Sequence, residues 1–379
     1  MKNTDILRAM KKRYLQDQIK KDLKSKMVFV SGPRQVGKTT VARSVLTDDT
    51  SYLNWDIPAH REAILKRELP LAELWCFDEI HKYSSWRDFL KGLYDEFQDV
   101  HEILVTGSAR LDMLRKSGDS LQGRYHHLRL HPLSVKELGL SRQEEFLELL
   151  GLGGFPEPYF GKSAVESKRW SLNYRSLLVN YESPAIESIS DLSKLELLSL
   201  RLPELVGSPL SLNALRQDLQ VAHKTIDRWI GVLENVYMLF RLSPFGSPLI
   251  RAVKKEQKHY HFDWSLVPDM SARFENLIAS HLLKWVHYQR DVFGEPLELR
   301  YFRDTDKREV DFCITNNFEP QMFVECKWKD SSTSSHLHYL QKKFPSAKYF
   351  QVSATGKKQF ENQKKIIHLP AISFLQEFV

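Results

Sequence analysis

The chain has 379 residues, of which 42% are hydrophobic and 27% charged, and it carries a formal net charge of +7. These values exclude a disordered chain, and the length predicts two or three domains. No apolar run approaches the ~20 residues that span a bilayer, the charged N-terminal segment does not resemble a signal peptide, and the three cysteines lack paired spacing, so we expect a cytoplasmic protein with no membrane partner.

The first third of the chain alternates short apolar runs with helical segments. We predict strands at 27–31, 74–77 and 103–106, and helices at 13–26 and 86–97. Strands that alternate with helices indicate a doubly wound parallel sheet. We therefore predict an α/β domain over residues 1–150.

A phosphate-binding pattern follows the first strand directly. The segment Gly-Pro-Arg-Gln-Val-Gly-Lys-Thr matches G-x-x-x-x-G-K-[ST] without a gap. The glycines let backbone amides turn inward, the lysine reaches the β- and γ-phosphates, and the threonine hydroxyl ligates Mg²⁺. The pattern predicts a P-loop NTPase fold with ATP and Mg²⁺ as cofactors. The predicted nucleotide-binding residues are Gly32, Pro33, Arg34, Gln35, Val36, Gly37, Lys38, Thr39 and Thr40.

Two carboxylates end the strand at 74–77. Mg²⁺ bound to a nucleotide usually needs a carboxylate at the end of a neighbouring strand. We predict that Asp78 holds Mg²⁺ together with Thr39, and that Glu79 orients or deprotonates the attacking water. The alternative is an exposed strand end without a role in the chemistry.

Further candidates for the phosphate site follow the third strand. Ser108 could place its hydroxyl near the γ-phosphate, and Arg124 or Arg110 could supply the cation that stabilises transferred charge. Spacing assigns neither arginine, nor does it say whether Arg124 acts in its own subunit or in a neighbouring one. Surface salt bridging is the alternative for both arginines.

Residues 151–265 form a helical region in which 212–219, a tight turn and 226–239 have the outline of a helix-turn-helix. The segment that follows could start a β-wing, so we predict a winged-helix-like region with DNA as a candidate partner. The positive net charge is compatible with this, although a solvated basic surface explains it as well. Two packed helices without a nucleic-acid role are the alternative.

Residues 266–379 predict a small α/β domain. The expected order is a helix at 273–288, strands at 298–302, 309–315 and 321–328, a helix at 337–344 and a strand at 348–352. Strict alternation along the second strand would point Val310 and Asp311 to opposite faces. Two adjacent strands could then present Asp311, Glu325 and Lys327 on one side, with Glu275 arriving from the helix.

These residue types suit metal-dependent cleavage of a phosphodiester. Glu275, Asp311 and Glu325 could hold one or two Mg²⁺ ions while Lys327 positions or activates the water. The order of elements and the D…E-x-K spacing resemble the PD-(D/E)xK nuclease superfamily, a restriction-endonuclease-like fold, although Val310 replaces the usual proline. Two alternatives are a cross-strand surface ion pair and a nuclease fold kept as a binding platform without chemistry.

The segments GPRQVGKTT, CFDEIHKYSSWRDFLKGLYDE, TGSARLDML and LQGRYHHLRLHPLSVKEL together resemble the prokaryotic AAA-type P-loop ATPases that carry a C-terminal domain of unknown function. The resemblance also includes GGFPEP, the helix-turn-helix and the VECK region, so it spans nearly the whole chain. It implies ATP binding and hydrolysis by Lys38, Thr39, Asp78 and Glu79, with Ser108 in the sensor position.

The sequence therefore leaves two functional hypotheses. In the first, an ATPase couples hydrolysis to a nucleic-acid-directed C-terminal half, which also cleaves nucleic acid if Asp311, Glu325 and Lys327 are catalytic. In the second, ATP occupancy switches a binding or signalling surface, and the C-terminal domain is catalytically silent. A homo-oligomer is a candidate assembly in both.

Overall fold

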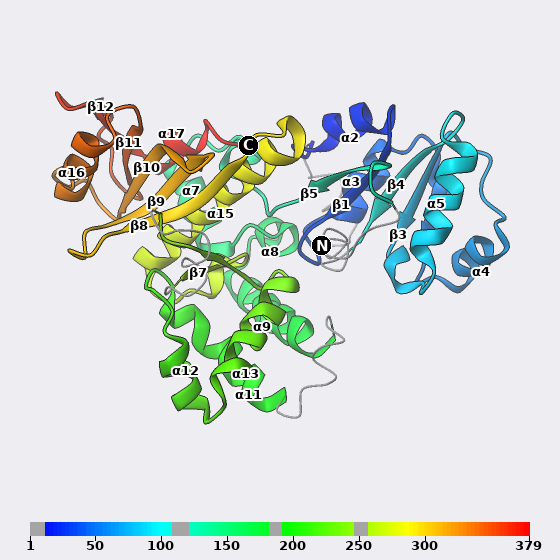
Figure 1. Ribbon diagram of the computed structural model, residues 1–379, viewed down its shortest axis with the longest axis horizontal. Coiled ribbons are helices and arrows are strands. Elements are labelled where there is room, and N and C mark those ends of the chain that lie inside the picture. The colour runs from blue at the N-terminus through cyan, green and yellow to red at the C-terminus, as the bar shows by residue number, and fades with distance from the viewer. Residues whose placement is uncertain (1–11, 108–120, 182–191, 246–256) are drawn as a thin grey trace. The chain divides into compact units, whose positions relative to one another are not determined.

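The computed structural model describes residues 12–107, 121–181, 192–245 and 257–379 (Figure 1). The chain divides into two compact units, Met1–Pro132 and Leu133–Val379. The predicted first domain ran to residue 150, but helices α6 (Val135–Leu138) and α7 (Gln143–Leu152) pack within the second unit. Among the residues that the structure describes, no helix is long and apolar enough to cross a membrane.

The first unit is built on a five-stranded parallel sheet with the order β2-β3-β4-β1-β5. The strands are β1 (Met27–Ser31), β2 (Tyr52–Asn54), β3 (Leu74–Asp78), β4 (Glu102–Thr106) and β5 (Tyr125–Arg129). The prediction of a parallel α/β sheet is thus confirmed. Because β4 lies between β1 and β3, the carboxyl ends of these three strands form one continuous edge.

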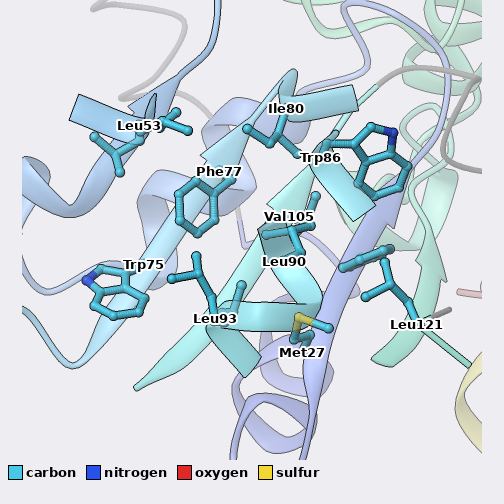
Figure 2. Packing of buried hydrophobic residues seen from close by; sticks show 13 residues of the cluster. Met27, Leu53, Trp75, Phe77, Ile80, Trp86, Leu90, Leu93, Val105 and Leu121 are labelled. Atoms are coloured by element: carbon cyan, nitrogen blue, oxygen red, sulfur yellow. The ribbon is translucent and has the colours of Figure 1, made fainter. Parts of the chain in front are cut away.

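The helices of the first unit are α2 (Gln16–Leu23), α3 (Lys38–Val45), α4 (Pro58–Lys66) and α5 (Trp86–Phe97), with short 3-10 turns at Asp49–Ser51 and Ile80–Lys82. Helix α5 buries Leu90 and Leu93 against Met27, Phe77 and Val105 of the sheet, as Figure 2 shows. Burial of large side chains contributes roughly 1.5–3 kcal/mol each to folding, so this packing holds the strand ends in fixed register.

The second unit begins with helices. After α6 and α7 come α8 (Pro156–Gly161), α9 (Ala164–Tyr181), α11 (Leu192–Arg201), a 3-10 turn at Leu202–Leu205, α12 (Leu212–Leu219) and α13 (His223–Asn235). Helices α12 and α13 lie where the helix-turn-helix was predicted, and α13 ends earlier because the chain turns into a strand. That strand, β6 (Leu239–Leu242), pairs antiparallel with β7 (Lys258–His261).

The C-terminal part of this unit contains a six-stranded sheet with the order β12-β13-β11-β10-β9-β8. It is preceded by a 3-10 turn at Trp264–Leu266 and the long helix α15 (Met270–Phe293), and it includes α16 (Ser335–Lys343) and α17 (Ala371–Leu375). Its strands are β8 (Leu297–Arg303), β9 (Glu309–Asn316), β10 (Glu319–Lys327), β11 (Lys348–Ser353), β12 (Phe360–Glu361) and β13 (Ile366–Pro370).

The strict alternation predicted for β9 is wrong. Arg300 pairs with Cys313 and Phe302 with Val310, so this stretch of β9 contains one residue more than the stretch of β8 that pairs with it. This β-bulge brings Val310 and Cys313 into the same apolar cluster. Asp311 lies outside that cluster, as the alternation from Val310 predicts, and its carboxylate accepts a hydrogen bond from the backbone amide of Cys326 at 2.8 Å.

A buried ion pair fixes α6 on α15. Lys284 donates to Glu137 and, at 3.0 Å, to the Ser134 hydroxyl, and the Lys284 and Glu137 side chains are 1% and 5% exposed. Removing one partner leaves an uncompensated buried charge, so we expect Lys284→Met to lower the free energy of unfolding by about 3–5 kcal/mol. Chemical denaturation, with a signal that reports on unfolding of the second unit, checks this prediction.

The controls are a double variant and an exposed pair. Lys284→Met/Glu137→Leu should recover most of the loss, because no charge then stays buried. Lys162→Met removes a lysine from an exposed pair with Glu148 and should change little. An equal loss in Lys284→Met and Lys162→Met would show that the buried pair is not important for stability.

Candidate functional site: the P-loop and an acidic pocket

The loop from Gly32 to Gly37 joins β1 to α3 in a conformation that only glycine tolerates at its two ends. Gly32 has φ +145°, and a Cβ added there would lie 2.2 Å from the Leu130 carbonyl oxygen. Gly37 has φ +100° and precedes the first residue of α3. The loop therefore leads its backbone directly into a helix N-terminus, where amides and the helix dipole favour phosphate.

Lys38 is the first residue of α3, and its side chain folds back onto this loop. Its side chain is buried, and Nζ donates to the carbonyl oxygens of Gly32 at 3.0 Å and Pro33 at 2.8 Å. These bonds hold the ammonium beside the helix N-terminus. The positive charge is therefore placed where the predicted phosphates would lie.

Asp78 is the hydrogen-bonding centre at the carboxyl edge of the sheet. Its oxygens accept from Thr39 at 2.9 Å, from Thr106 at 2.6 Å and from the Tyr52 hydroxyl. Two neighbouring ligands of an octahedral Mg²⁺, each bound at about 2.1 Å, lie about 3.0 Å apart. The oxygen types of Thr39 and Asp78 and their separation fit the predicted metal ligands.

Glu79 follows Asp78 in a left-handed backbone conformation with φ 56°. Its backbone N–H donates a hydrogen bond to the Thr106 carbonyl at 2.9 Å, which holds this conformation. Burial raises the pKa of its carboxyl, and the charge of Asp78 adds to the rise. Lys82, whose Nζ lies 3.4 Å from Glu79, opposes it. A carboxylate with a raised pKa beside the predicted metal ligands is a suitable base for water.

We expect ATP turnover to be lost as the pH is lowered, and this loss should occur at a higher pH than the ordinary pKa of a glutamate would give. The base form of Glu79 is needed, and a raised pKa keeps the protonated form to higher pH, so activity is gained as pH rises through that pKa. Lys82→Met removes a charge that lowers the pKa and should move the acidic limb further up. A limb that does not move in Lys82→Met would assign it to another group.

Three residues of this site were not predicted from sequence. The guanidinium of Arg13 donates to the carbonyls of Val36 at 2.8 Å and His131 at 2.5 Å, and so ties the P-loop to the segment after β5. Thr106 and Tyr52 bind the carboxylate of Asp78. Thr106 ends a predicted strand, which is a usable signal, whereas nothing in the local pattern around Arg13 indicates its buried role.

Three of the predicted residues lie outside the described residues or away from the P-loop. Ser108 and Arg110 lie outside the described residues. Arg124 precedes β5, and its carbonyl accepts from the Met27 amide, so it lies at the amino edge of the sheet, about 16 Å of strand from the P-loop. It binds Asp95 through two nitrogens at 2.7 and 3.2 Å. Of the two alternatives left open for Arg124, this position disfavours a role at its own subunit's nucleotide, and a role at a neighbouring subunit's nucleotide stays a prediction.

The C-terminal candidates line one pocket of about 260 Å³ in the second unit. Glu275 comes from α15, Asp311 from β9, and Glu325 and Lys327 from β10. Glu325 accepts from Lys327 Nζ at 2.8 Å through one oxygen, while its other oxygen, Oε2, is buried with no hydrogen-bond partner. The structure thus brings the predicted residues together.

A second lysine, which sequence reasoning missed, is buried beside two carboxylates of the pocket. Nζ of Lys258, from β7, lies 2.7 Å from Glu309, 3.4 Å from Glu275 and 3.9 Å from Asp311. Burial raises the pKa of the Glu275, Asp311 and Glu325 carboxyls, and the charge of Asp311 adds to the rise for the other two. Within the described part of the chain, no three His, Cys, Asp or Glu side chains are arranged to hold a metal ion.

Family comparisons divide the chain into three parts. Residues 24–139 match the family described as AAA domain, residues 143–276 a domain of unknown function (DUF8612), and residues 270–372 another (DUF4143). The first match covers the P-loop and the Asp78-Glu79 pair. The prediction of an AAA-type P-loop ATPase is thus confirmed for this part of the chain, and the match supports ATP binding and hydrolysis there.

The similar whole proteins carry the description uncharacterized protein. One from Mycobacterium tuberculosis is 23% identical over 316 residues, which cover 78% of this chain and 69% of the relative. One from Haemophilus influenzae is 20% identical over 352 residues, which cover 83% of this chain and 86% of the relative. These relatives extend the likeness beyond the ATPase domain and add no activity to it.

Solved structures with some likeness include RuvB of Thermotoga maritima, at 18% identity and TM-score 0.31, covering 62% of this chain and 93% of that one. ORC1 of Aeropyrum pernix, solved in complex with DNA, has 15% identity and TM-score 0.33, covering 73% and 92%. TM-scores this low support no conclusion about fold or function.

Proposed function

We propose that the protein hydrolyses ATP at the carboxyl edge of the first sheet and couples the reaction to its C-terminal half. The observation that carries the proposal is the hydrogen-bonded group of Thr39, Asp78 and Thr106, with Glu79 directly beside it. This group joins the P-loop helix to the two neighbouring strand ends. Nucleotide, metal and water can therefore meet at one point.

Each residue then has a distinct task. Loop amides and Lys38 bind the β- and γ-phosphates, and Thr39 and Asp78 hold Mg²⁺. The metal, when bound, neutralises charge that develops on the phosphate oxygens. Glu79 accepts a proton from the attacking water, and burial suits its pKa to that task.

The C-terminal half is proposed to act on nucleic acid through a winged-helix-like region. Helices α12 and α13 followed by the β6–β7 hairpin support this, and Lys224 and Arg228 on α13 are exposed. DNA is the proposed partner. A homo-oligomer, with Arg124 acting on a neighbour's nucleotide, and a cytoplasmic location complete the proposal.

Metal-dependent cleavage of DNA by Asp311, Glu325 and Lys327 is the further-reaching form of this proposal. It is supported by their convergence, together with Glu275, on one pocket. Incubation of the protein with plasmid and single-stranded DNA in Mg²⁺ or Mn²⁺ tests it. Cleavage should disappear in Asp311→Ala and Lys327→Ala, and cleavage that persists unchanged in them would come from a contaminant or another site.

The second candidate function is an ATP-switched binding protein with a silent C-terminal domain. Lys258 favours it, because an ammonium already lies among the carboxylates that a metal would need. ATP turnover with and without DNA separates the two. Nucleic-acid coupling predicts a several-fold change with DNA that Lys224→Ala/Arg228→Ala removes and Lys162→Ala keeps, whereas turnover indifferent to DNA favours the switch.

A further inference from the structure

The ammonium of Lys258 has the surroundings of a bound cation. Its side chain is 1% exposed, and three carboxylates from two elements face it: Glu275 of α15, and Glu309 and Asp311 of β9. Lys258 reaches them from β7, which belongs to a different sheet. A buried ammonium persists only where its charge is compensated, and here the compensation comes from Glu275 and Asp311, which line the pocket, and from Glu309.

The same oxygens are the ones that a divalent ion would need. Glu275 and Asp311 each place an oxygen within 4 Å of Nζ. An ion held by them would lie within a few ångströms of a like charge in a site with little solvent to screen it. A metal and the Lys258 ammonium therefore exclude one another.

A carboxylate oxygen of the pocket that does not contact Lys258 is an independent observation in favour of a cation-binding site. Oε2 of Glu325 is buried without a hydrogen-bond partner, and Glu325, 6% exposed, lines the pocket with Glu275 and Asp311. An unsatisfied buried carboxylate oxygen is costly unless a donor or cation arrives. The unpartnered oxygen is thus available to a cation that enters the pocket.

We propose that Lys258 is a tethered cation that competes with divalent metal ions for Glu275 and Asp311, and so controls whether the acidic pocket binds metal. The inference rests on the pocket assigned above to the proposed function, but not on cleavage of DNA. It makes Lys258 a regulator of the pocket. Withdrawal of Lys258 would convert the pocket into a metal site, so the metal-dependent cleavage proposed above would require that Lys258 be withdrawn.

Mn²⁺ binding without nucleotide or nucleic acid tests the proposal, followed by calorimetry and by the electron paramagnetic resonance signal of free Mn²⁺. Wild-type protein should bind no Mn²⁺ in a manner that depends on Asp311. Lys258→Met should gain one site at least roughly tenfold tighter than any Asp311-dependent binding in the wild type, and Lys258→Met/Asp311→Asn should lose it. Because the P-loop is intact in the wild type and in these variants, any Mn²⁺ bound there contributes equally to each and does not affect the difference.

Two more variants keep the test decisive. Lys258→Met/Glu309→Gln removes one charge of each sign, so it should fold even where the single variant does not, and it should bind Mn²⁺. Lys258→Arg keeps the charge and should not. The proposal is overturned by equal Asp311-dependent binding in wild type and Lys258→Met, or by no gain in the folded charge-balanced variant. Cleavage can fail independently, because no DNA enters this experiment.

Discussion

Replacing Lys38 with alanine should weaken ATP binding roughly 10- to 150-fold, the range that the loss of a charged hydrogen bond of about 1.5–3 kcal/mol gives. The ammonium is held by the Gly32 and Pro33 carbonyls at the N-terminus of α3, and no other described lysine lies inside this loop. Titration of the protein with a fluorescent ATP analogue measures the change.

Lys66→Ala is the matched control, because Lys66 is an exposed lysine of the same unit, paired with Glu62 on α4. It should bind nucleotide as the wild type does. If Lys38→Ala and Lys66→Ala bound the analogue with the affinity of the wild type, the loop would not be the nucleotide site.

Replacing Glu79 with glutamine should slow hydrolysis roughly 10²- to 10⁴-fold while ATP still binds, because a general base contributes that range and the amide keeps the size of the side chain. The separation of the two effects follows from position. Lys38 lies in the loop, whereas Glu79 lies beyond Asp78 at the end of β3. Phosphate release and analogue titration on the same sample measure both.

Glu73→Gln is the control for Glu79→Gln, because Glu73 lies at the opposite end of the same strand. Glu73 is exposed and precedes β3, at the amino edge of the sheet. It should hydrolyse ATP normally. A Glu79→Gln protein with wild-type turnover would assign the activation of water to another group.

The P-loop and the carboxylate pair could be predicted from sequence because each is encoded in consecutive residues. A strand, a glycine-framed loop and a helix are specified locally, and Asp78 and Glu79 terminate an apolar run that can only be a buried strand. The parallel order of the sheet then brings the two motifs to one edge. The same reasoning placed α12, α13, α15 and the strands β8 to β11 close to their observed bounds.

The remaining features depend on contacts between residues far apart in the chain. Arg13 binds the P-loop from 23 residues away, and Lys258 reaches carboxylates of α15 and β9 from another sheet. Neither residue type nor spacing signals a buried ammonium. The bulge that brings Cys313 into the apolar cluster was hidden for the same reason, since it is set by pairing with β8. The position of Arg124 relative to the P-loop could not be predicted either, because spacing does not say at which edge of a sheet a residue lies.

Steady-state phosphate release by the wild-type protein with Mg²⁺ and ATP tests the central claim most directly. The account predicts turnover that saturates with ATP, exceeds the background of the Lys38→Ala protein, and drops toward that background in Glu79→Gln. Binding of ATP without release of phosphate above that background would contradict it.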